Sequence, residues 1–538
     1  MKQAVIYLFF ILISSVLFSQ TEVQEEWINT IQDLSGLDIE LDDYNNVYVL
    51  TTNCTIIKYD TNGVEQWTVT YEASTGGETA VALTVDNSNN ICFTGSIHGI
   101  DSWHDIVTVK NDPDGNQLWE MIYQTPSWAY TSEPIGIVTD NSGNVYVSGY
   151  SYYSTEFTGY CQCVTIKYNS DGTEEWISIY EPPFDNWVEP SALTIDESGS
   201  VNITGGNGLK SGQLINLDKF VTIKYDPNGI MQWEAFYSGV DWATARAITV
   251  DSDSNIYIAG DCWEPEGMDM VTIKYNENGD VLWDSHYVSS SLYGNCPIAI
   301  ETDFEGNVII IIDTYHDFAT IKYDQEGTEQ WIVFYDSGGI NWWDVPYDLA
   351  VDQYGNIYVT GSAGSEETYS DYVTLRYSPT GSQEWLIRYD GVNNYHDSSK
   401  AISLDNFGNI YITGRSSMVG SGYSCVTIKY SQSTYANDED VIFPEIHLSN
   451  YPNPFNPSTT IYFSLTTEFT ESIELIIYNI KGQKIRTLYP FPNGSLGTRE
   501  VIWDGTDENN QPVSSGIYFY RLNIDNKTEA AKKMMLIK

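Results

Sequence analysis

The stretch VTIKYDPNGIMQWEAFYSGVDWATARAITVDSDSNIYIAG (residues 221–260) contains four short apolar segments separated by polar turns. VTIKY (221–225) and the segment around Trp233 flank the turn DPNG, while AITVD (247–251) and NIYIAG (255–260) flank a second turn. The segments are rich in β-branched and aromatic residues, which is typical of β-strands. Asp, Asn and Gly at the turns favour tight hairpins. This stretch therefore predicts an antiparallel meander of four strands.

The same four segments recur in the same order along the chain. We count eight of each, and the tryptophans that mark one of them are about 51 residues apart. Four-stranded units of this length cannot bury both faces alone, so they are expected to pack side by side as blades of a β-propeller. The fold class is therefore all-β. The marker residues are Trp27, Trp67, Trp119, Trp176, Trp233, Trp283, Trp331 and Trp385.

The order of the segments also predicts how the ring closes. The repeat begins with a tryptophan strand at Trp27 and ends with a VTIKY strand at 426–430, which no tryptophan strand follows. We expect the first strand to complete the last blade, so that no sheet edge stays open. Eight copies of each segment predict an eight-bladed propeller over residues 24–430. A seven-bladed ring with one irregular unit is the alternative.

The repeat resembles the family of β-propeller repeats known as SBBP repeats. The resemblance rests on VTIKYDPNGIMQWEAFYSG and ARAITVDSDSNIYIAG within 221–260, and it extends over about residues 24–430. It implies a propeller fold and an extracellular setting, but no activity. The name of the family implies seven blades, and the count in this chain differs from that number.

The N-terminus has the features of a secretory signal peptide over residues 1–19. Lys2 precedes an apolar run from Ala4 to Phe18, and small and polar residues follow it. Cleavage is expected near Ser19 and Gln20. No other stretch approaches the roughly 18 apolar residues of a transmembrane helix, so we expect no membrane span in the mature protein.

The composition changes after the last repeat. A polar linker (431–443) leads into residues 444–538, where short strand-like segments alternate with Gly, Asn and Pro turns. This pattern predicts a small Ig-like β-sandwich.

The C-terminal segment resembles the type A sorting domain of type IX secretion substrates. The resemblance implies recognition by an outer-membrane translocon, followed by removal of the domain by a sortase-type peptidase. The passenger would then be released or attached to the cell surface. The matching motifs are NYPNPFNP (450–457), YNIKGQKI (478–485), WDGTDENNQPVSSGIYFYRL (503–522) and the Lys-rich last strand. The residues that mark the signal are Pro452, Pro454, Asn456, Gly482, Trp503, Gly505, Gly516, Lys532 and Lys533.

The charge of the chain is concentrated in the repeats. Lys and Arg total 24 against 74 Asp and Glu, a net charge of −50, and residues 21–443 contain only 14 of the cations. A surface this acidic argues against nucleic acid as a partner. Eight of the 14 cations occupy one register of the repeat, so we expect them to pair with carboxylates on neighbouring strands. They are Lys58, Lys110, Lys167, Lys224, Lys274, Lys322, Arg376 and Lys429.

The long connections between strands share one end of the meanders and are rich in aromatic and acidic residues. Exposed aromatic rings beside carboxylates suit the binding of glycans or peptides. We therefore select Trp103, Trp128, Trp263 and Trp342 as candidate ligand-binding residues. Trp187, Trp242 and Trp343 each lie five residues before a strand begins, and this fixed offset favours packing between blades.

Two further hypotheses concern metal binding and disulfides. Asp105, Asp269, Asp317 and Asp371 recur two residues before the VTIKY strand and are weak candidates for Ca²⁺ ligands, although capping of strand ends is the favoured role. Cys262 and Cys296 lie in connections of adjacent blades and form a candidate disulfide. The six histidines show no metal-ligand spacing, and no nucleophile motif is present.

Together these features predict a secreted or surface-attached propeller that serves as a binding or scaffold module for a glycan, peptide or protein. No cofactor is expected beyond the weak calcium hypothesis. Two alternatives remain open: a glycan-active hydrolase or lyase built on the propeller, and a structural component of the surface layer.

Overall fold

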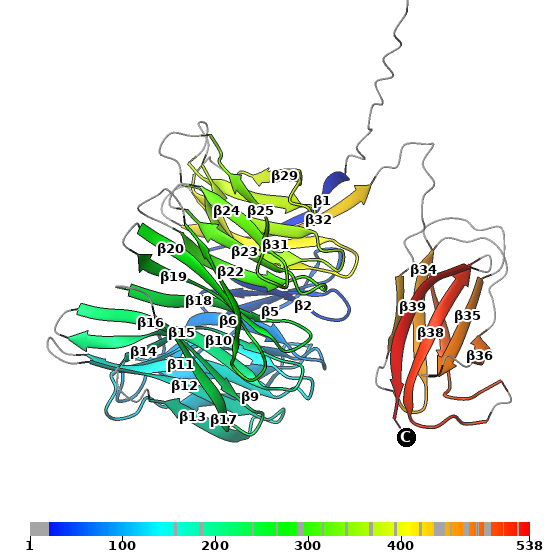
Figure 1. Cartoon of the computed structure of the whole chain (residues 1–538), viewed down its shortest axis with the longest axis horizontal. Coiled ribbons are helices and arrows are strands. Elements are labelled where there is room, and N and C mark those ends of the chain that lie inside the picture. The colour runs from blue at the N-terminus through cyan, green and yellow to red at the C-terminus, as the bar shows by residue number, and fades with distance from the viewer. Residues whose placement is uncertain are drawn as a thin grey trace, which may run out of the picture. The chain divides into compact units, whose positions relative to one another are not determined.

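The computed structural model divides the chain into two units, residues 1–435 and 436–538, which are described separately (Figure 1). The predicted signal peptide, most of the linker, Trp342, Pro452, Pro454 and Gly482 lie outside the described residues. The structure describes residues 21–154, 159–181, 187–211, 214–238, 242–264, 267–288, 295–314, 317–338, 343–364, 369–391, 395–418, 422–434, 447–451, 455–465, 473–479, 481, 484–488, 497–508, 511–524 and 527–537.

All regular elements in the described parts of the chain are β-strands, which confirms the predicted fold class. No described helix is long and apolar enough to cross a membrane. In the first unit the strands form four-stranded antiparallel groups, which we number sheet 1 to sheet 8 in chain order. Sheets 3, 4 and 5 are also linked by single parallel contacts, Cys161 with Trp187 and Asp218 with Ala243.

Each sheet uses its strands in the same order. The first strands are β2 (Gly36–Leu41), β6 (Thr79–Val85), β10 (Thr131–Thr139), β14 (Trp187–Ile195), β18 (Trp242–Val250), β22 (Cys296–Thr302), β26 (Val345–Val351) and β30 (Asp397–Leu404). The second strands are β3 (Val47–Thr51), β7 (Ile91–Ile97), β11 (Val145–Ser154), β15 (Val201–Ser211), β19 (Ile256–Glu264), β23 (Val308–Asp313), β27 (Ile357–Ala363) and β31 (Ile410–Ser417).

The two outer positions follow the same scheme. The third strands are β4 (Thr55–Tyr59), β8 (Asp105–Asn111), β12 (Gly159–Tyr168), β16 (Leu214–Tyr225), β20 (Gly267–Tyr275), β24 (Phe318–Tyr323), β28 (Asp371–Tyr377) and β32 (Tyr423–Thr434). The fourth strands carry the marker tryptophans: β5 (Glu65–Thr70), β9 (Gln117–Tyr123), β13 (Glu174–Tyr180), β17 (Met231–Ser238), β21 (Val281–Tyr287), β25 (Glu329–Tyr335), β29 (Gln383–Tyr389) and β1 (Thr21–Gln32).

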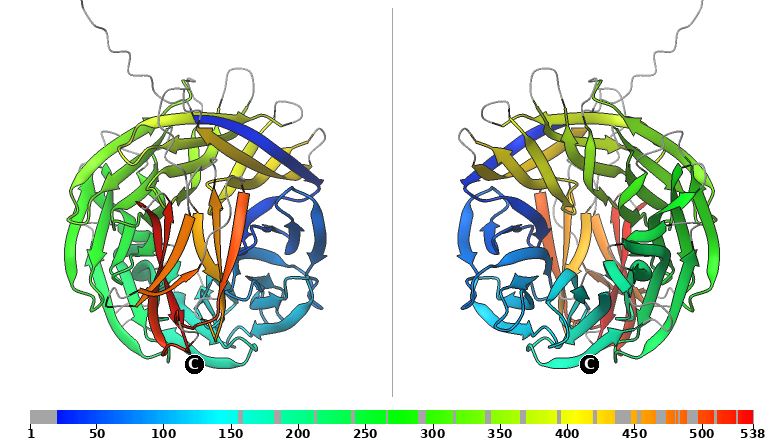
Figure 2. Two further views of the ribbon diagram at one scale, coloured as in Figure 1. Left: turned by 90° about the vertical axis from the view of Figure 1, so that its right-hand side faces the viewer. Right: turned by 90° about the vertical axis from the view of Figure 1, so that its left-hand side faces the viewer.

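The first strands contact one another in cyclic order from β2 through β30 and back to β2. Figure 2 shows the resulting ring, with the blue first strand β1 beside β32. β1 pairs antiparallel with β32, Ile28 opposite Ile428, so the N-terminal strand completes sheet 8 as the sequence predicted. This pairing joins the beginning and the end of the repeat region within one sheet.

Apolar side chains fill the space between neighbouring sheets because each sheet buries both of its faces. Between sheets 5 and 6, for example, Tyr257 and Ala259 pack with Ile310 and Ile321 in one buried cluster. Similar clusters lie between the other neighbouring sheets. The continuous apolar runs in the second and third strands follow from this burial.

The marker tryptophans join each sheet to the next one in the ring. In seven of them the indole N–H donates a hydrogen bond of 2.8–3.4 Å to a backbone carbonyl in the short turn between the third and fourth strands of the next sheet. A glycine with positive φ in that turn lies against the ring. A Cβ at Gly229, for instance, would meet the ring of Trp176 at 2.6 Å.

The repeated cations form a second inter-sheet joint, and in the described residues six of the eight form an ion pair with a carboxylate, whereas Lys58 and Lys429 donate to backbone carbonyls. Lys110 Nζ lies 2.7 Å from Asp86 of its own sheet and donates to the carbonyl of Gly143 in the next sheet. Burial opposes the ionisation of Asp86, but hydrogen bonds from Lys110 and Asn90 lower its pKa below the ordinary value. Equivalent pairs are Lys224 with Asp196, Lys274 with Asp251 and Lys322 with Asp303.

The described strands of the second unit form two sheets. β33 (His447–Tyr451), β34 (Thr459–Leu465) and β37 (Gly497–Trp503) form one sheet. β35 (Ile473–Asn479), β36 (Lys484–Leu488), β38 (Gly516–Ile524) and β39 (Lys527–Leu536) form the other. Residues of both sheets share one buried core, which includes Ile461, Ile477 and Trp503.

Candidate functional site

The two ends of the sheets differ in their connections. Antiparallel order places the short turns, such as 86–90 and 112–116, at one end, which we call the short-turn end. The connections from second to third strand and from fourth strand to the next sheet lie at the other end, the long-loop end. Loops carried on a rigid scaffold are the common location of binding residues.

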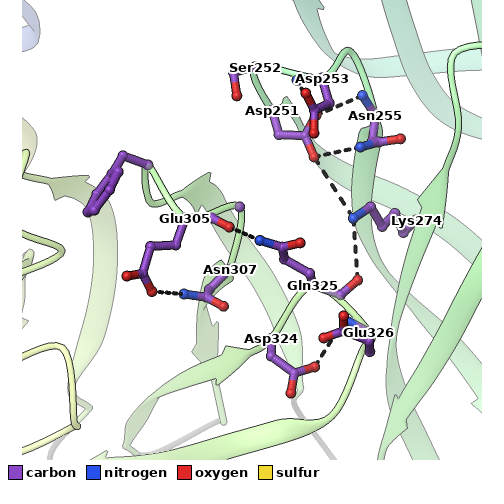
Figure 3. Close-up of a pocket in the computed structure, with 12 residues that line it drawn as sticks. Asp251, Ser252, Asp253, Asn255, Lys274, Glu305, Asn307, Asp324, Gln325 and Glu326 are labelled. Carbon is purple, nitrogen blue, oxygen red and sulfur yellow. Dashed lines mark hydrogen bonds and ion pairs between the residues drawn. The ribbon is translucent and has the colours of Figure 1, made fainter.

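The cavity in Figure 3 lies at the short-turn end between sheets 5 and 6 and has a volume of about 610 Å³. Asp251 accepts hydrogen bonds from the backbone N–H and the side-chain amide of Asn255 and from the hydroxyl of Tyr257. Lys274 lies 3.9 Å from Asp251 and donates to the carbonyl of Gln325. The same joint recurs around the ring, so these groups serve the packing of the sheets.

A surface cluster of aromatic rings lies at the long-loop end of sheets 2 and 3. Trp103 is 68% exposed and stacks on Tyr130, and Tyr130 packs against Tyr153 with the ring centroids 4.7 Å apart. The backbone N–H of Trp103 donates to the carbonyl of Tyr130 and holds the two segments together. Trp128 is 40% exposed.

A cavity of about 520 Å³, which we call cavity A, lies at the long-loop end between sheets 4, 5 and 6. Four side chains give it its chemistry: a carboxylate from Glu189, a hydroxyl from Ser191, an indole from Trp242 and a guanidinium from Arg246. The apolar part of its lining comes from Pro190, Leu217, Ala245, Pro297 and Ile298.

Arg246 is held in place by its surroundings. It forms an ion pair with Asp261, whose side chain is fully buried, and its guanidinium lies 5.6 Å from the ring centroid of Trp242. Burial raises the pKa of Asp261, although Arg246 opposes this shift. The guanidinium and the indole face are thereby oriented in advance of any ligand.

A second cavity of about 420 Å³, cavity B, lies between sheets 7 and 8. It is lined by Trp343, Tyr347, His396 and Arg415, together with Val345, Ser362, Tyr369, Ser370 and Ser398. Lys400 Nζ lies 3.4 Å from the ring centroid of Tyr347. Burial opposes ionisation of this phenol, but Lys400 lowers its pKa below the ordinary value.

The tryptophans selected from sequence are distributed over several places. Trp103 and Trp128 belong to the surface around sheets 2 and 3, and Trp263, 38% exposed, lies opposite Trp242 in the β18–β19 ladder. Of the three residues at the fixed offset, Trp187 is buried, whereas Trp242 lines cavity A and Trp343, 57% exposed, lines cavity B. Glu189, Arg246 and Arg415 were not among the sequence candidates, because the repeat pattern carries no signal for them.

The four recurring aspartates have different surroundings. Asp105 accepts hydrogen bonds from the backbone N–H of Thr125 and the hydroxyl of Ser102, which is a capping role. Asp269 is buried. Asp317 and Asp371 each lie close to two further aspartates, Asp317 to Asp336 and Asp344, and Asp371 to Asp390 and Asp397. Asp336 and Asp390 both follow a marker tryptophan by five residues, an offset from which they could have been predicted.

The disulfide between Cys262 and Cys296 remains a prediction; Cys262 is buried and Cys296 is partly buried. Successive side chains of a strand point to opposite faces. On β19, Asp261 faces Arg246 and the Cys296 side, whereas Cys262 packs in the core with Phe220 of sheet 4.

In the second unit, the described residues of the sorting signal serve the fold or remain exposed. Trp503 is fully buried, and Gly505 adopts a φ of 69° with the carbonyl of Pro457 beside it. Gly516 also has a positive φ. Asn456, Lys532 and Lys533 are exposed.

Comparisons with known families agree with this organisation. Residues 449–538 match the model of the secretion system C-terminal sorting domain. Residues 339–366 and 387–417 match the model of the SBBP beta-propeller repeat. Both resemblances stated from the sequence are thus confirmed. A search among curated proteins finds no match.

Solved structures resemble the propeller unit at low identity. The Dos1 propeller has a TM-score of 0.50 at 8% identity, and the match covers 76% of this chain and 95% of that one. BamB from Moraxella catarrhalis (TM-score 0.44, 12% identity, 76% and 99% covered) and the WD40 domain of SCAP from fission yeast (0.44, 9%, 76% and 98%) are further examples. The Dos1 match supports the fold alone. The chain therefore combines β-propeller repeats with a C-terminal sorting domain of secretion systems.

Proposed function

We propose that this chain is a secreted or cell-surface eight-bladed propeller, exported by the type IX route, that binds a glycan through cavity A. The eight sheets serve as blades, and the second unit serves as an Ig-like sorting module that is removed after export. The observation that carries the binding role is the combination in cavity A of an indole, a guanidinium, a carboxylate and a hydroxyl at the long-loop end.

The four groups suit a sugar ring better than a purely apolar ligand. The C–H face of a pyranose stacks on an indole such as Trp242. Its hydroxyls would accept hydrogen bonds from Arg246 and donate to Glu189 and to Ser191, whose own hydroxyl proton is donated to the carbonyl of Ala245. Because the ion pair with buried Asp261 holds Arg246, little side-chain entropy is lost on binding.

A glycan array probed with the purified full chain tests this role. We expect Trp242→Ala and Arg246→Gln to reduce binding at least tenfold, as is usual for residues at the centre of a binding site. Phe304→Ala is the matched control, because Phe304 is an exposed aromatic residue, 73% accessible, at the short-turn end. Absence of any bound glycan, or binding unaffected by both substitutions, would refute the proposal.

The export route is tested separately by deleting residues 449–538 in the native host. We expect the propeller to accumulate inside the cell envelope instead of outside it. The full chain with Ser458→Ala, an exposed position outside the matching motifs, is the control and should be exported normally. Export of the deletion variant at the wild-type level would contradict the proposed route.

A further inference from the structure

Two groups of three aspartates lie at the long-loop end, where sheet 7 meets its two neighbours. Within each group, one carboxylate oxygen of every residue lies within 4.8 Å of the other two. Two oxygens that bind one Ca²⁺ at about 2.4 Å are at most about 4.8 Å apart. The first group is Asp317, Asp336 and Asp344, and the second is Asp371, Asp390 and Asp397.

Asp371 distinguishes the second group. Its side chain is 4% exposed, and its Oδ1 has no hydrogen-bond partner among the described residues. Its other oxygen, Oδ2, lies 3.4 Å from the guanidinium of Arg388. A buried carboxylate oxygen without a partner is costly, and a bound cation would satisfy it.

The neighbouring carboxylate of Asp397 is already oriented. It accepts hydrogen bonds from the backbone N–H groups of Gly391, at 2.6 Å, and Ser417, at 3.2 Å. Asp390 follows β29 and is exposed, so it leaves the group open to solvent and to an incoming ion. The three ligands come from β28, from the segment after β29 and from β30 of the next sheet.

The local charge also favours a cation. Among the described residues, Arg388 forms an ion pair with Asp371, and its guanidinium is shared with the carbonyl of Gly364 and the hydroxyl of Tyr335. One guanidinium cannot balance the six carboxylates of the two groups. A site made only of oxygen ligands selects hard cations such as Ca²⁺ over transition metals.

We propose that Asp371, Asp390 and Asp397 bind a calcium ion that fastens sheet 7 to sheet 8, with water or backbone oxygens as the remaining ligands. Ca²⁺ is favoured over Mg²⁺ because it tolerates irregular geometry, whereas Mg²⁺ requires a near-ideal octahedron. An affinity in the range of about 0.1–1 mM, typical of extracellular modules, would suit a protein outside the cell.

The test uses the purified full chain after removal of metals with EDTA. We expect Ca²⁺ at 10 mM to raise the Tm by about 2 °C or more, and Mg²⁺ to have a smaller effect. Tb³⁺, a luminescent substitute for Ca²⁺, should bind with sensitised emission and be displaced by Ca²⁺. Absence of both the Tm shift and Tb³⁺ binding would overturn the proposal.

Asp390→Asn is the decisive variant because Asp390 is exposed. It should weaken Ca²⁺ binding at least tenfold, while its Tm in EDTA stays equal to or above that of the wild type, since one like charge is removed. Asp171→Asn, an exposed turn residue, is the matched control and should bind as the wild type does. If Asp390→Asn lowers the Tm in EDTA and leaves the Ca²⁺ response unchanged, the proposed site is wrong. It is also wrong if Asp336→Asn loses Ca²⁺ binding and Asp390→Asn does not.

Discussion

At the scale of single residues, a buried lysine such as Lys110 pairs with an aspartate of its own sheet and donates to a carbonyl of the next sheet. The side chains of Lys110 and Asp86 are each 2% exposed, so removing one partner leaves the other charge buried and unpaired. We expect Lys110→Met to lower the free energy of unfolding by about 3–5 kcal/mol. Lys219→Met, whose ion pair with Asp218 is partly exposed, should cost no more than about 1 kcal/mol. Chemical denaturation measures both, and equal effects would contradict a role specific to the buried pair.

The turn glycines are a second residue-scale feature. Gly229 has a φ of 79°, and a Cβ there would meet the ring of Trp176 at 2.6 Å. Gly338 has a similar φ of 87°, but no described atom lies within 4 Å of its would-be Cβ. Gly338→Ala should therefore cost only the backbone strain, about 1 kcal/mol, and Gly229→Ala a further 1–3 kcal/mol, roughly, for the clash. Thermal unfolding of the two variants separates these terms, and equal losses would argue against the glycine–tryptophan contact.

At the scale of elements, sheet 8 depends on a strand that is distant in sequence. Its fourth strand, β1, has no short turn to β32, and Trp385 of sheet 7 donates to the side-chain amide of Gln432 in place of a turn carbonyl. We expect Ile28→Pro, in the middle of the β1–β32 ladder, to lower the Tm by several degrees, because proline removes a ladder hydrogen bond and breaks strand pairing. Val64→Pro, in an exposed turn, is a control for the introduction of proline, because the Val64 N–H donates to the side chain of Asp60 and not to a strand partner. Comparable Tm values for the two variants would mean that the closing strand contributes little.

At the scale of the whole molecule, the first strands bring carboxylates from distant sheets within electrostatic reach. Burial, together with the charges of Asp38, Asp348 and Glu301, raises the pKa of Glu40 from 4.5 to about 8. Burial likewise raises the pKa of Asp348 to about 7. The folded chain thus keeps protons that the unfolded chain has already lost above about pH 4.5.

This arrangement predicts that the stability decreases as the pH rises from about 5 to about 8. The sign follows because the native state binds more protons than the unfolded state throughout that window. Glu40→Gln should make the dependence shallower, whereas Glu197→Gln, at an exposed turn position, should leave it unchanged. Denaturant titrations at pH 5, 6, 7 and 8.5 measure this. An equally steep pH dependence in Glu40→Gln would show that this carboxyl group does not cause it.

Much of the architecture could be predicted because it repeats. The strand order, the register of Lys110 and its equivalents, and the pairing of β1 with β32 all follow from segments that recur at fixed spacing. The cavities could not be predicted, because they lie where the repeat pattern ends. Trp187 and Trp242 each lie five residues before the same predicted strand of their repeats. Leu217 and Cys161 nevertheless cover Trp187, whereas Trp242 lines cavity A.

The pairing of β1 with β32 has a consequence for the order of events during synthesis and export. The first strand of the ring is made roughly 400 residues before its partner, so the edge of sheet 8 stays unpaired until residue 434 is available. The residues that match the sorting domain begin at 449, directly afterwards. A chain that ends prematurely within the repeats contains β1 but lacks both β32, its partner, and the segment that matches the sorting domain. Under the proposed export route, only full-length chains carry the sorting domain. Only chains that are able to close the ring therefore reach the outside.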